Sequence, residues 1–316
     1  MTEPSNTQEK ILVIKLGALG DFIQSLGPMA AIRDHHPRAE ISLLTTESYY
    51  SLGRECGYFD HVVIDDKPKW KNFSGWKKLH KFFNGSKFTR VYDLQNNDRT
   101  AIYFRLFKTK PEWVGAARGA SHQNNSPSRT TGHAYDGHVQ TLKIAGINNV
   151  NIDDMSWVKG DTDHFHIQSP YVLLIPGSAP SRPEKRWPAH NYKTLARNLY
   201  GWGYTPVIIG TNIESETASL ICETCPSAAD LTGKTSISDI VLLARHAAAA
   251  IGNDTGPMHI IAPTGCPTYV LFSAHSNPVK HGPIGENVTI ISHDALEDLS
   301  ADNVLSQLRA REFRGS

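Results

Sequence analysis

The sequence lacks a long apolar run and has few cysteines, and both absences exclude whole classes of protein. No stretch approaches the roughly 20 apolar residues of a membrane-spanning helix, and the run Ile11–Leu16 is too short for a signal-peptide core. Four scattered cysteines cannot form a disulfide framework. The one C-x-x-C pair, Cys222 and Cys225, closes a predicted helix, whereas a redox pair usually opens one. We therefore expect a cytoplasmic protein with reduced thiols.

The chain also lacks a strong charge of either sign and the common phosphate-binding motifs. Its formal net charge is +1, from 32 basic and 31 acidic side chains, so no global field favours nucleic acid and any anion site must be local. No G-x-G-x-x-G and no P-loop follows the first apolar run. This removes the main support for bound NAD or ATP, and no cofactor is expected.

What the sequence does contain is two successive series of short Val-, Ile- and Leu-rich runs that alternate with helical patterns. Such alternation is typical of parallel sheets covered by helices on both faces. A length of 316 residues suits two domains. We predict an α/β fold of two Rossmann-like, doubly wound domains, 1–160 and 161–316, facing a central cleft. A final helix near 301–311 is a candidate for packing back onto the first domain.

The expected elements follow from the apolar runs. Strands are predicted at Ile11–Lys15, Ile41–Thr45, His61–Asp65, Arg90–Leu94 and Trp113–Gly115, then at Tyr171–Ile175, Pro206–Ile209, Ala248–Gly252, Thr268–Phe272 and Val288–Ile291. One helix is expected over Asp21–Asp34, and the segment 119–133, rich in Ser, Asn and Gly, is expected to be a mobile loop. Open α/β sheets bind ligands at the carboxyl ends of their strands.

The first strand ends in a glycine-containing turn that leads to a carboxylate. The turn reads Leu-Gly-Ala-Leu-Gly-Asp over residues 16–21 and places Asp21 in the first turn of a helix. An acid there can simply stabilise the helix dipole. In the functional alternative, Asp21 is a general base that takes a proton from an acceptor hydroxyl.

A basic loop over residues 176–188 follows the first strand of the second half. It combines cations such as Lys185 with hydroxyl groups such as Ser178. A diphosphate leaving group needs such positive charge, because negative charge accumulates on its oxygens as the bond to the sugar breaks. A solvated basic loop is the alternative.

Two further signals follow later strands of the second half. Glu214 stands where an acid often accepts hydrogen bonds from ribose hydroxyls, although it could equally be an ordinary helix acid, and Glu216 competes with it for this role. The segment Gly252–His259 reads Gly-Asn-Asp-Thr-Gly-Pro-Met-His, which predicts the amides of Thr255 and Gly256 at a helix N-terminus that could hold phosphate. Asp254 or Thr255 as a plain N-cap is the alternative.

Together these motifs resemble the bacterial heptosyltransferase family, whose enzymes add heptose to the lipopolysaccharide inner core. The resemblance rests on the opening Gly-Ala-Leu-Gly-Asp, on Asp93-Leu94-Gln95, on Lys185-Arg186-Trp187-Pro188, and on Asp254-Thr255-Gly256 followed by His259. It implies a GT-B fold, an inverting and metal-independent transfer, ADP-heptose or a related nucleotide-sugar as donor and a lipopolysaccharide core acceptor.

The resemblance also implies roles for particular residues. Asp21 matches the family's catalytic base, and Lys185 matches its phosphate-contacting lysine. The expected donor-binding residues are Ser178, Lys185, Glu214, Asp254, Thr255, Gly256 and His259. The chain reads Phe-Ser-Ala-His over 272–275 where family members often have Phe-Gly-Pro-Thr, near the expected sugar position. A D-x-D at Asp161–Asp163 lies in the interdomain connector, and we interpret it as a solvated turn and not as a metal site.

Two other functions stay open at this point. One is a nucleotide-sugar epimerase of the same architecture, and the other is a non-catalytic nucleotide-sugar-binding protein.

The segment Lys67–Arg90 is basic, contains no acid and has interleaved aromatic residues. Apolar side chains at i, i+3 and i+7 within Trp76–Phe83 predict a helix with one face in the core. The simplest interpretation is a core stripe with a solvated basic face. The alternative is that lysines of this segment bind an anionic acceptor or the anionic inner face of the membrane, with peripheral attachment there. The candidate acceptor-binding residues are Lys77, Lys78 and Lys81.

Overall fold

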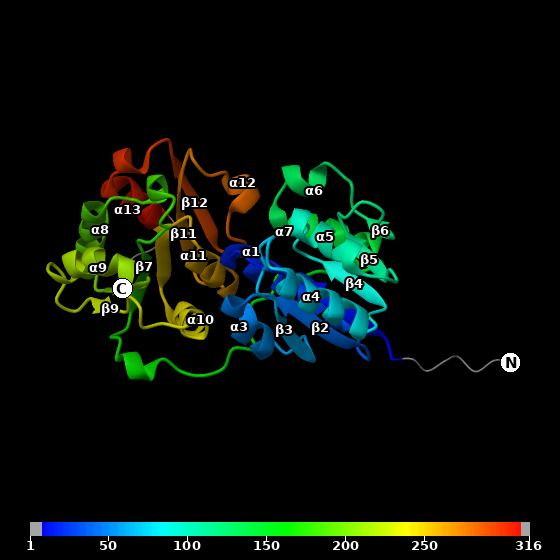
Figure 1. Cartoon of the computed structure of the whole chain (residues 1–316). Coiled ribbons are helices and arrows are strands. Elements are labelled where there is room, and N and C mark those ends of the chain that lie inside the picture. Colours follow the sequence, from blue (N-terminus) through cyan, green and yellow to red (C-terminus); the bar gives the residue numbers. More distant parts are fainter. Residues whose placement is uncertain (1–7, 311–316) are drawn as a thin grey trace. The chain divides into compact units, whose positions relative to one another are not determined.

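The computed structural model describes residues 8–310 and divides into two units that are contiguous in sequence, Met1–Asp153 and Asp154–Ser316 (Figure 1). The boundary that the sequence predicts, at residue 160, lies a few residues after this observed boundary, within the connector between the two sheets. Each unit is a parallel sheet with flanking helices, which confirms an α/β fold with two Rossmann-like domains. No helix within 8–310 combines the length and apolar character needed to cross a membrane.

The first unit contains a six-stranded parallel sheet in the order β3-β2-β1-β4-β5-β6. This is the strand order of a nucleotide-binding Rossmann domain, in which the direction of the crossovers reverses between β1 and β4. The strands span Lys10–Ile14 (β1), Glu40–Thr45 (β2), His61–Ile64 (β3), Arg90–Asp93 (β4), Glu112–Gly115 (β5) and His122–Gln123 (β6). The helices are Leu19–Gln24 (α1), Leu26–His35 (α2), Tyr50–Glu55 (α3), Phe73–Gly85 (α4), Asp98–Leu106 (α5), Ser128–Thr131 (α6) and Ala134–Ile144 (α7).

Two sequence predictions for this unit are wrong in detail. The helix expected over 21–34 is two helices, α1 and α2, which meet at Ser25, where the hydroxyl donates to Phe22 O (2.7 Å). A side-chain bond of this kind competes with the regular helical pattern. The segment 119–133, expected to be a mobile loop, contains the edge strand β6 and the short helix α6.

Helix α4 packs against the sheet as its apolar spacing predicts. Leu79 and Phe83 are buried, and Trp76 is partly buried against the same cluster. The Phe83 ring stacks on Phe107 with ring centroids 4.9 Å apart. The core stripe of the basic segment is therefore confirmed, and its lysines lie on the opposite side of the helix.

The second unit repeats the architecture of the first without repeating its sequence. Its sheet has the order β12-β11-β10-β7-β8-β9, which is the Rossmann order when counted from β7. The strands span Tyr171–Ile175 (β7), Thr205–Ile208 (β8), Ala229–Asp230 (β9), Ala249–Asn253 (β10), Thr268–Ser273 (β11) and Val288–His293 (β12). The helices are Ala189–Gly201 (α8), Ser215–Cys222 (α9), Ile237–His246 (α10), Gly256–Ile261 (α11), Pro278–His281 (α12) and Ala301–Ala310 (α13).

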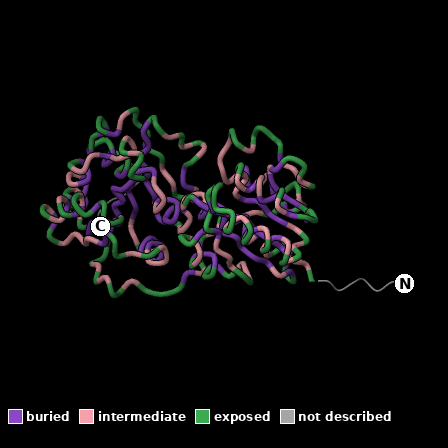
Figure 2. Tube along the Cα trace, viewed as in Figure 1, coloured by how far each residue is buried: buried purple, intermediate pink, exposed green. Residues whose placement is uncertain are grey.

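Consecutive residues of the central strands are buried, so both faces of these strands are covered, and Figure 2 shows buried segments in the middle of each unit. This explains why they read as continuous apolar runs. The sequence makes the final helix, α13, a candidate for packing onto the first domain. In the structure, the apolar side of α13 is buried in the core of its own unit. Val304 and Leu308 of α13 lie in one cluster with Leu195 of α8.

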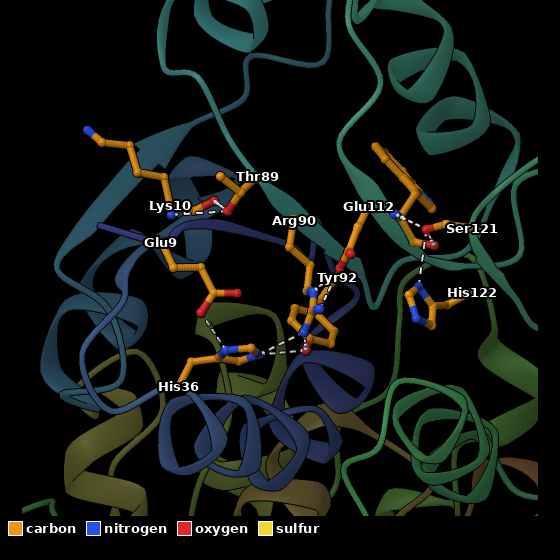
Figure 3. Close-up of polar contacts among 10 residues, drawn as sticks. Glu9, Lys10, His36, Thr89, Arg90, Tyr92, Glu112, Ser121 and His122 are labelled. Atoms are coloured by element: carbon orange, nitrogen blue, oxygen red, sulfur yellow. Dashed lines mark hydrogen bonds and ion pairs between the residues drawn. The ribbon is translucent and has the colours of Figure 1, made fainter. Parts of the chain in front are cut away.

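A polar network centred on His36 lies at the end of the first sheet where the strands begin (Figure 3). His36 is buried at the end of α2, with Nδ1 2.8 Å from Glu9 Oε2 and Nε2 2.7 Å from the Tyr92 hydroxyl. Arg90, which begins β4, donates to Tyr92 (3.3 Å) and pairs with Glu112, which begins β5. This network lies at the opposite edge of the sheet from the carboxyl ends of the strands.

We expect this network to make stability depend on pH. Burial lowers the pKa of His36 below 6.5, an effect that Arg90 and His35 reinforce and that Glu9 opposes. The unfolded chain therefore takes up a proton before the folded one does, and stability is lost as the pH falls below about 6.5. Urea midpoints measured between pH 8 and pH 5 should fall more steeply for the wild-type protein than for His36→Gln. Equal slopes in the two proteins would show that His36 is not the group responsible.

Candidate functional site

The first group of candidate residues lies at the carboxyl edge of the first sheet, between β1 and β4. Lys15 directly follows β1, and the loop after β4 begins at Leu94. The Leu16 amide donates to Gln95 Oε1 (2.8 Å), which joins the two strand ends. Asp21 lies in the first turn of α1, as predicted. The crossover direction reverses here, so this is the ligand-binding position of a doubly wound sheet.

A cavity of about 160 Å³ opens at this edge. Most of its lining residues are polar or charged, and they come from the residue that follows β1, from α1, from the loop after β4, and from the segment that contains α6 and α7. The lining residues are Lys15, Asp21, Leu94, Gln95, Asn96, Arg129, Ala134, Gly137 and His138. Acidic, basic and amide groups thus converge on one cavity, which is typical of a polar ligand site.

Lys15 and His138 form the buried back of this cavity. The Lys15 ammonium donates to Leu94 O (3.1 Å) and lies 3.5 Å from His138 Nε2. Burial lowers the pKa of Lys15 to about 8, against the opposing charges of Asp21 and Asp93. Burial, reinforced by Lys15 and Arg129, lowers the pKa of His138 well below its usual value. Near neutral pH the cavity therefore contains a lysine cation beside a neutral imidazole.

Asp93, at the end of β4, holds the neighbouring loop in place. Its Oδ1 accepts hydrogen bonds from the amides of Gln95 (3.0 Å) and Asn96 (2.8 Å). Burial raises the pKa of Asp93 to about 6, although these bonds and the Lys15 charge oppose the rise. Asp93 thus positions Gln95 and Asn96 on the cavity wall.

Sequence reasoning singles out Asp21 in this cavity but misses Lys15, His138 and Arg129. One available signal is that Lys15 ends a strand that is otherwise apolar. A charged residue is rarely buried unless it is paired or functional. His138 and Arg129 carry no comparable signal, because they lie more than a hundred residues further along the chain and reach the cavity only through tertiary packing.

The second group lies at the matching position of the second sheet, between β7 and β10. Asn253 ends β10, and its Nδ2 donates to Pro176 O (2.7 Å), while its Oδ1 accepts from the Trp187 amide (3.1 Å). This buried amide therefore fixes both ends of the basic loop to the sheet. The loop and the turn Asp254–Gly256 lie together at this edge, as the sequence predicts.

Lys185 and Asp254 form an ion pair with Nζ and Oδ2 2.6 Å apart, and both side chains are largely buried, with exposed fractions of 18% and 6%. The Ser276 hydroxyl donates to the same Asp254 oxygen (2.6 Å) and lies 3.1 Å from Lys185 Nζ. The three residues thus come from three different strand-end loops. Ser276 is a member of this cluster that the sequence does not reveal.

The remaining cations of the basic loop are also anchored within it. Arg186 donates to Ser178 through Nε to the hydroxyl (3.1 Å) and through its terminal nitrogen to the carbonyl (3.2 Å). Arg182 pairs with Glu184 and donates to His275 O (2.8 Å). The loop is therefore an ordered array of cations held against the loop after β11, which disfavours the alternative of a freely solvated basic loop.

The Glu214 side chain lies against two glycines, one shortly after β7 and one shortly after β8. A Cβ added to Gly177 would lie 2.9 Å from Glu214 Cδ, and one added to Gly210 would lie 3.0 Å from Glu214 Oε2. Oε2 already accepts from the amide and the hydroxyl of Thr211 (2.8 Å each) in a capping box. No group within residues 8–310 donates to Oε1, so Glu214 is both a cap and a carboxylate with one oxygen available for a ligand.

The other predicted site residues are placed as follows. Thr255 is the N-cap of α11 and makes no side-chain capping bond, Gly256 is the first residue of the helix, and His259 is buried within it.

In the D-x-D segment, the Asp163 amide donates to Asp161 Oδ1 (3.2 Å) and both acids are exposed, which confirms a solvated turn.

The three lysines predicted to contact an acceptor do not line the cavity at Asp21. Lys77, Lys78 and Lys81 are exposed on α4. Lys78 pairs with Asp66 (3.2 Å) across the surface, with both side chains well exposed. Such a pair contributes little to stability, so it leaves the basic face open to other partners.

Three comparisons with known proteins agree with this geometry. The family model of glycosyltransferase family 9 (heptosyltransferase) matches residues 147–307. The lipopolysaccharide core heptosyltransferase OpsX of Haemophilus influenzae is 21% identical over 305 residues, which cover 90% of this chain and 84% of OpsX.

Two solved structures share the fold. A glycosyltransferase family 9 protein from Veillonella parvula superimposes with a TM-score of 0.81 and 21% identity, over 96% of both chains. The Escherichia coli heptosyltransferase WaaC, solved with ADP, superimposes with a TM-score of 0.74 and 17% identity, over 95% of this chain and 99% of WaaC.

Proposed function

The chain belongs to glycosyltransferase family 9, the heptosyltransferase family, and from this premise we propose that it transfers a heptose from ADP-heptose to a lipopolysaccharide inner-core acceptor. We further propose that the transfer inverts the anomeric configuration and needs no metal ion. Membership of a glycosyltransferase family favours transfer over the epimerase and the non-catalytic binding protein that the sequence leaves open.

The observation that carries the proposal is the Lys185–Asp254 cluster at the ligand-binding position of the second sheet, within the residues that the family model matches. A diphosphate placed there would meet Lys185 and the anchored arginines, and Glu214 Oε1 would accept from a ribose hydroxyl. The choice of ADP as the nucleotide of the donor is supported by WaaC, which has been solved with ADP and with ADP-2-deoxy-2-fluoro heptose. Ser178, Thr255, Gly256 and His259 are proposed to complete the donor site.

The first sheet is proposed to bind the acceptor. Asp21 would take the proton from the attacking hydroxyl, and the cation of Lys15 would bind an anionic group of the acceptor in the same cavity. Lys77, Lys78 and Lys81 would attract the acceptor from outside this cavity. Because core intermediates are carried by the membrane, the enzyme would work in the cytoplasm at the inner face of the membrane.

Incubation with ADP-heptose and a lipopolysaccharide core acceptor tests the proposal. We expect the heptosylated acceptor, with an anomeric configuration opposite to that of the donor by NMR, and undiminished activity in EDTA. Isomerised donor without transfer would support the epimerase instead, and binding without turnover would support the binding protein. Activity lost in EDTA and restored by magnesium would contradict the metal-independent mechanism.

The Lys15 charge should make acceptor binding depend on pH. Because the pKa of Lys15 is about 8, the side chain loses its charge above that pH. We expect the acceptor KM to rise by about tenfold between pH 7 and pH 9.5, the effect of losing one charge-assisted hydrogen bond. In Lys15→Arg, whose guanidinium stays charged, the rise should disappear while the donor KM stays the same. A rise of equal size in both proteins would assign the effect to another group.

A further inference from the structure

Two large apolar side chains project into solvent where the chain enters α4. Trp70 is 74% exposed and Phe73 is 80% exposed, and neither belongs to the apolar core cluster of the first unit. Single exposed apolar residues are common, but two aromatic side chains only three positions apart in the chain and both this exposed form a patch. Nothing in the core packing or in the cavity at Asp21 explains them.

The segment that carries these side chains is firmly held. Buried Asp65 accepts from the Tyr103 hydroxyl (2.5 Å), and the Trp76 indole donates to Lys69 O (3.2 Å). The Asn72 side chain accepts from the Gly75 amide and caps α4. The Trp70 ring stacks on Trp76 with ring centroids 5.7 Å apart. The exposed aromatic groups are thus presented from an ordered surface.

Lysines surround the two aromatic side chains. Lys67, Lys69 and Lys71 flank Trp70 in the chain, and all three are exposed. Lys77 follows Phe73 by one helical turn on the same side of α4. Asp66 is the only acid between residues 66 and 90, and it pairs with Lys78. We call Trp70, Phe73, Lys67, Lys69, Lys71 and Lys77 the aromatic–lysine patch.

This composition matches an anionic lipid surface better than it matches a protein partner. Aromatic side chains enter the boundary between headgroups and acyl chains, while lysines contact the negatively charged headgroups. Because the segment follows the carboxyl end of β3, the patch lies at the same edge of the first sheet as Asp21. If the chain binds a membrane through this patch, the edge of the first sheet that carries Asp21 lies next to the membrane.

We propose that the aromatic–lysine patch docks the protein on an anionic membrane, with Trp70 and Phe73 inserted into the interface. The inference deepens the proposed function, because it rests on an acceptor that the membrane carries. It assigns membrane attachment to two aromatic side chains as well as to the basic charge of the segment.

Sedimentation of the full chain with vesicles tests the proposal, without donor or acceptor present. We expect binding to vesicles of phosphatidylglycerol and phosphatidylethanolamine and none to phosphatidylcholine. Trp70→Ala with Phe73→Ala should weaken the binding by at least about tenfold, and so should Lys69→Gln with Lys71→Gln at low salt. The matched control is Ile213→Ala with Val279→Ala, which removes two apolar side chains that are 59% and 70% exposed in the second unit and should change nothing.

Insertion itself is tested by quenching of tryptophan fluorescence with brominated lipids. Trp70→Phe keeps an aromatic side chain, so it should still bind vesicles, but most of the quenching should be lost. Wild-type binding by the Trp70→Ala and Phe73→Ala double variant would overturn the proposal.

Two other results would also overturn the proposal by assigning the patch to another occupant. If the double variant binds vesicles normally but fails to use a delipidated, water-soluble acceptor, the patch belongs to the acceptor. If it instead converts a wild-type dimer into a monomer, the patch belongs to a second copy of the chain. Vesicle binding is measured without transfer, so absence of transferase activity would contradict the proposed function and leave this inference standing.

Discussion

Asp21→Asn is expected to lower turnover by about 10²–10⁴-fold, the usual contribution of one positioned general base. Asparagine preserves the shape of the side chain but cannot accept the acceptor proton. Donor binding should stay near the wild-type level, because the proposed donor site is built from the second unit. Single-turnover rates and calorimetric titration with the donor nucleotide would measure the two effects separately.

Asp98→Asn is the matched control for this change. Asp98 is an exposed acid in the first turn of α5, at the same edge of the same sheet, but it does not line the cavity. If Asp21 only stabilises its helix, both variants should lose similar stability, about 0.3–1 kcal/mol, and neither should lose turnover. Wild-type turnover in Asp21→Asn would therefore show that Asp21 only stabilises the N-terminus of its helix and is not the general base.

Lys185→Ala is expected to weaken donor binding and to slow transfer by about 10²–10³-fold. The larger effect should be on the chemical step, because the charge that Lys185 meets grows as the diphosphate leaves. The variant also leaves the Asp254 carboxylate buried without its cation, so its melting temperature should fall. Lys185→Ala combined with Asp254→Asn should recover stability without recovering transfer.

Lys193→Ala provides the control for removing a paired lysine from the second unit. Lys193 of α8 lies 3.7 Å from Glu223 in a surface ion pair and belongs neither to the basic loop nor to the turn Asp254–Gly256. Such a pair contributes about 0–1 kcal/mol, and the variant should keep its donor affinity and rate. Equal behaviour of the two lysine variants would remove Lys185 from the proposed donor site.

Much of the fold could be predicted because the central strands are buried on both faces. Their apolar runs therefore stand out from the helices between them, and β7 spans the residues that the sequence predicts. The edge strands β6 and β9 are only two residues each, too short for any periodicity to reveal. Their existence depends on pairing with β5 and β8, which is a tertiary contact.

The candidate site shows the same division between local and distant signals. Asp21 and Lys185 lie in loops whose composition is unusual, so the sequence alone points to them. Ser276 and His138 are ordinary residues whose neighbours are 91 and 123 positions away in the chain. Nothing in the local sequence selects them, because only the folded sheet brings their loops together.

The contiguity of the two units has a consequence for how the chain is made. Every strand of the first sheet, including the last one at His122–Gln123, and the helix α7 that follows are complete before Asp153. The first unit can therefore close its core on the ribosome while the second is still being synthesised. The parallel pairings of β1 with β2 and with β4 all form within this early segment, so no sheet edge of the first unit has to wait for a strand from the second.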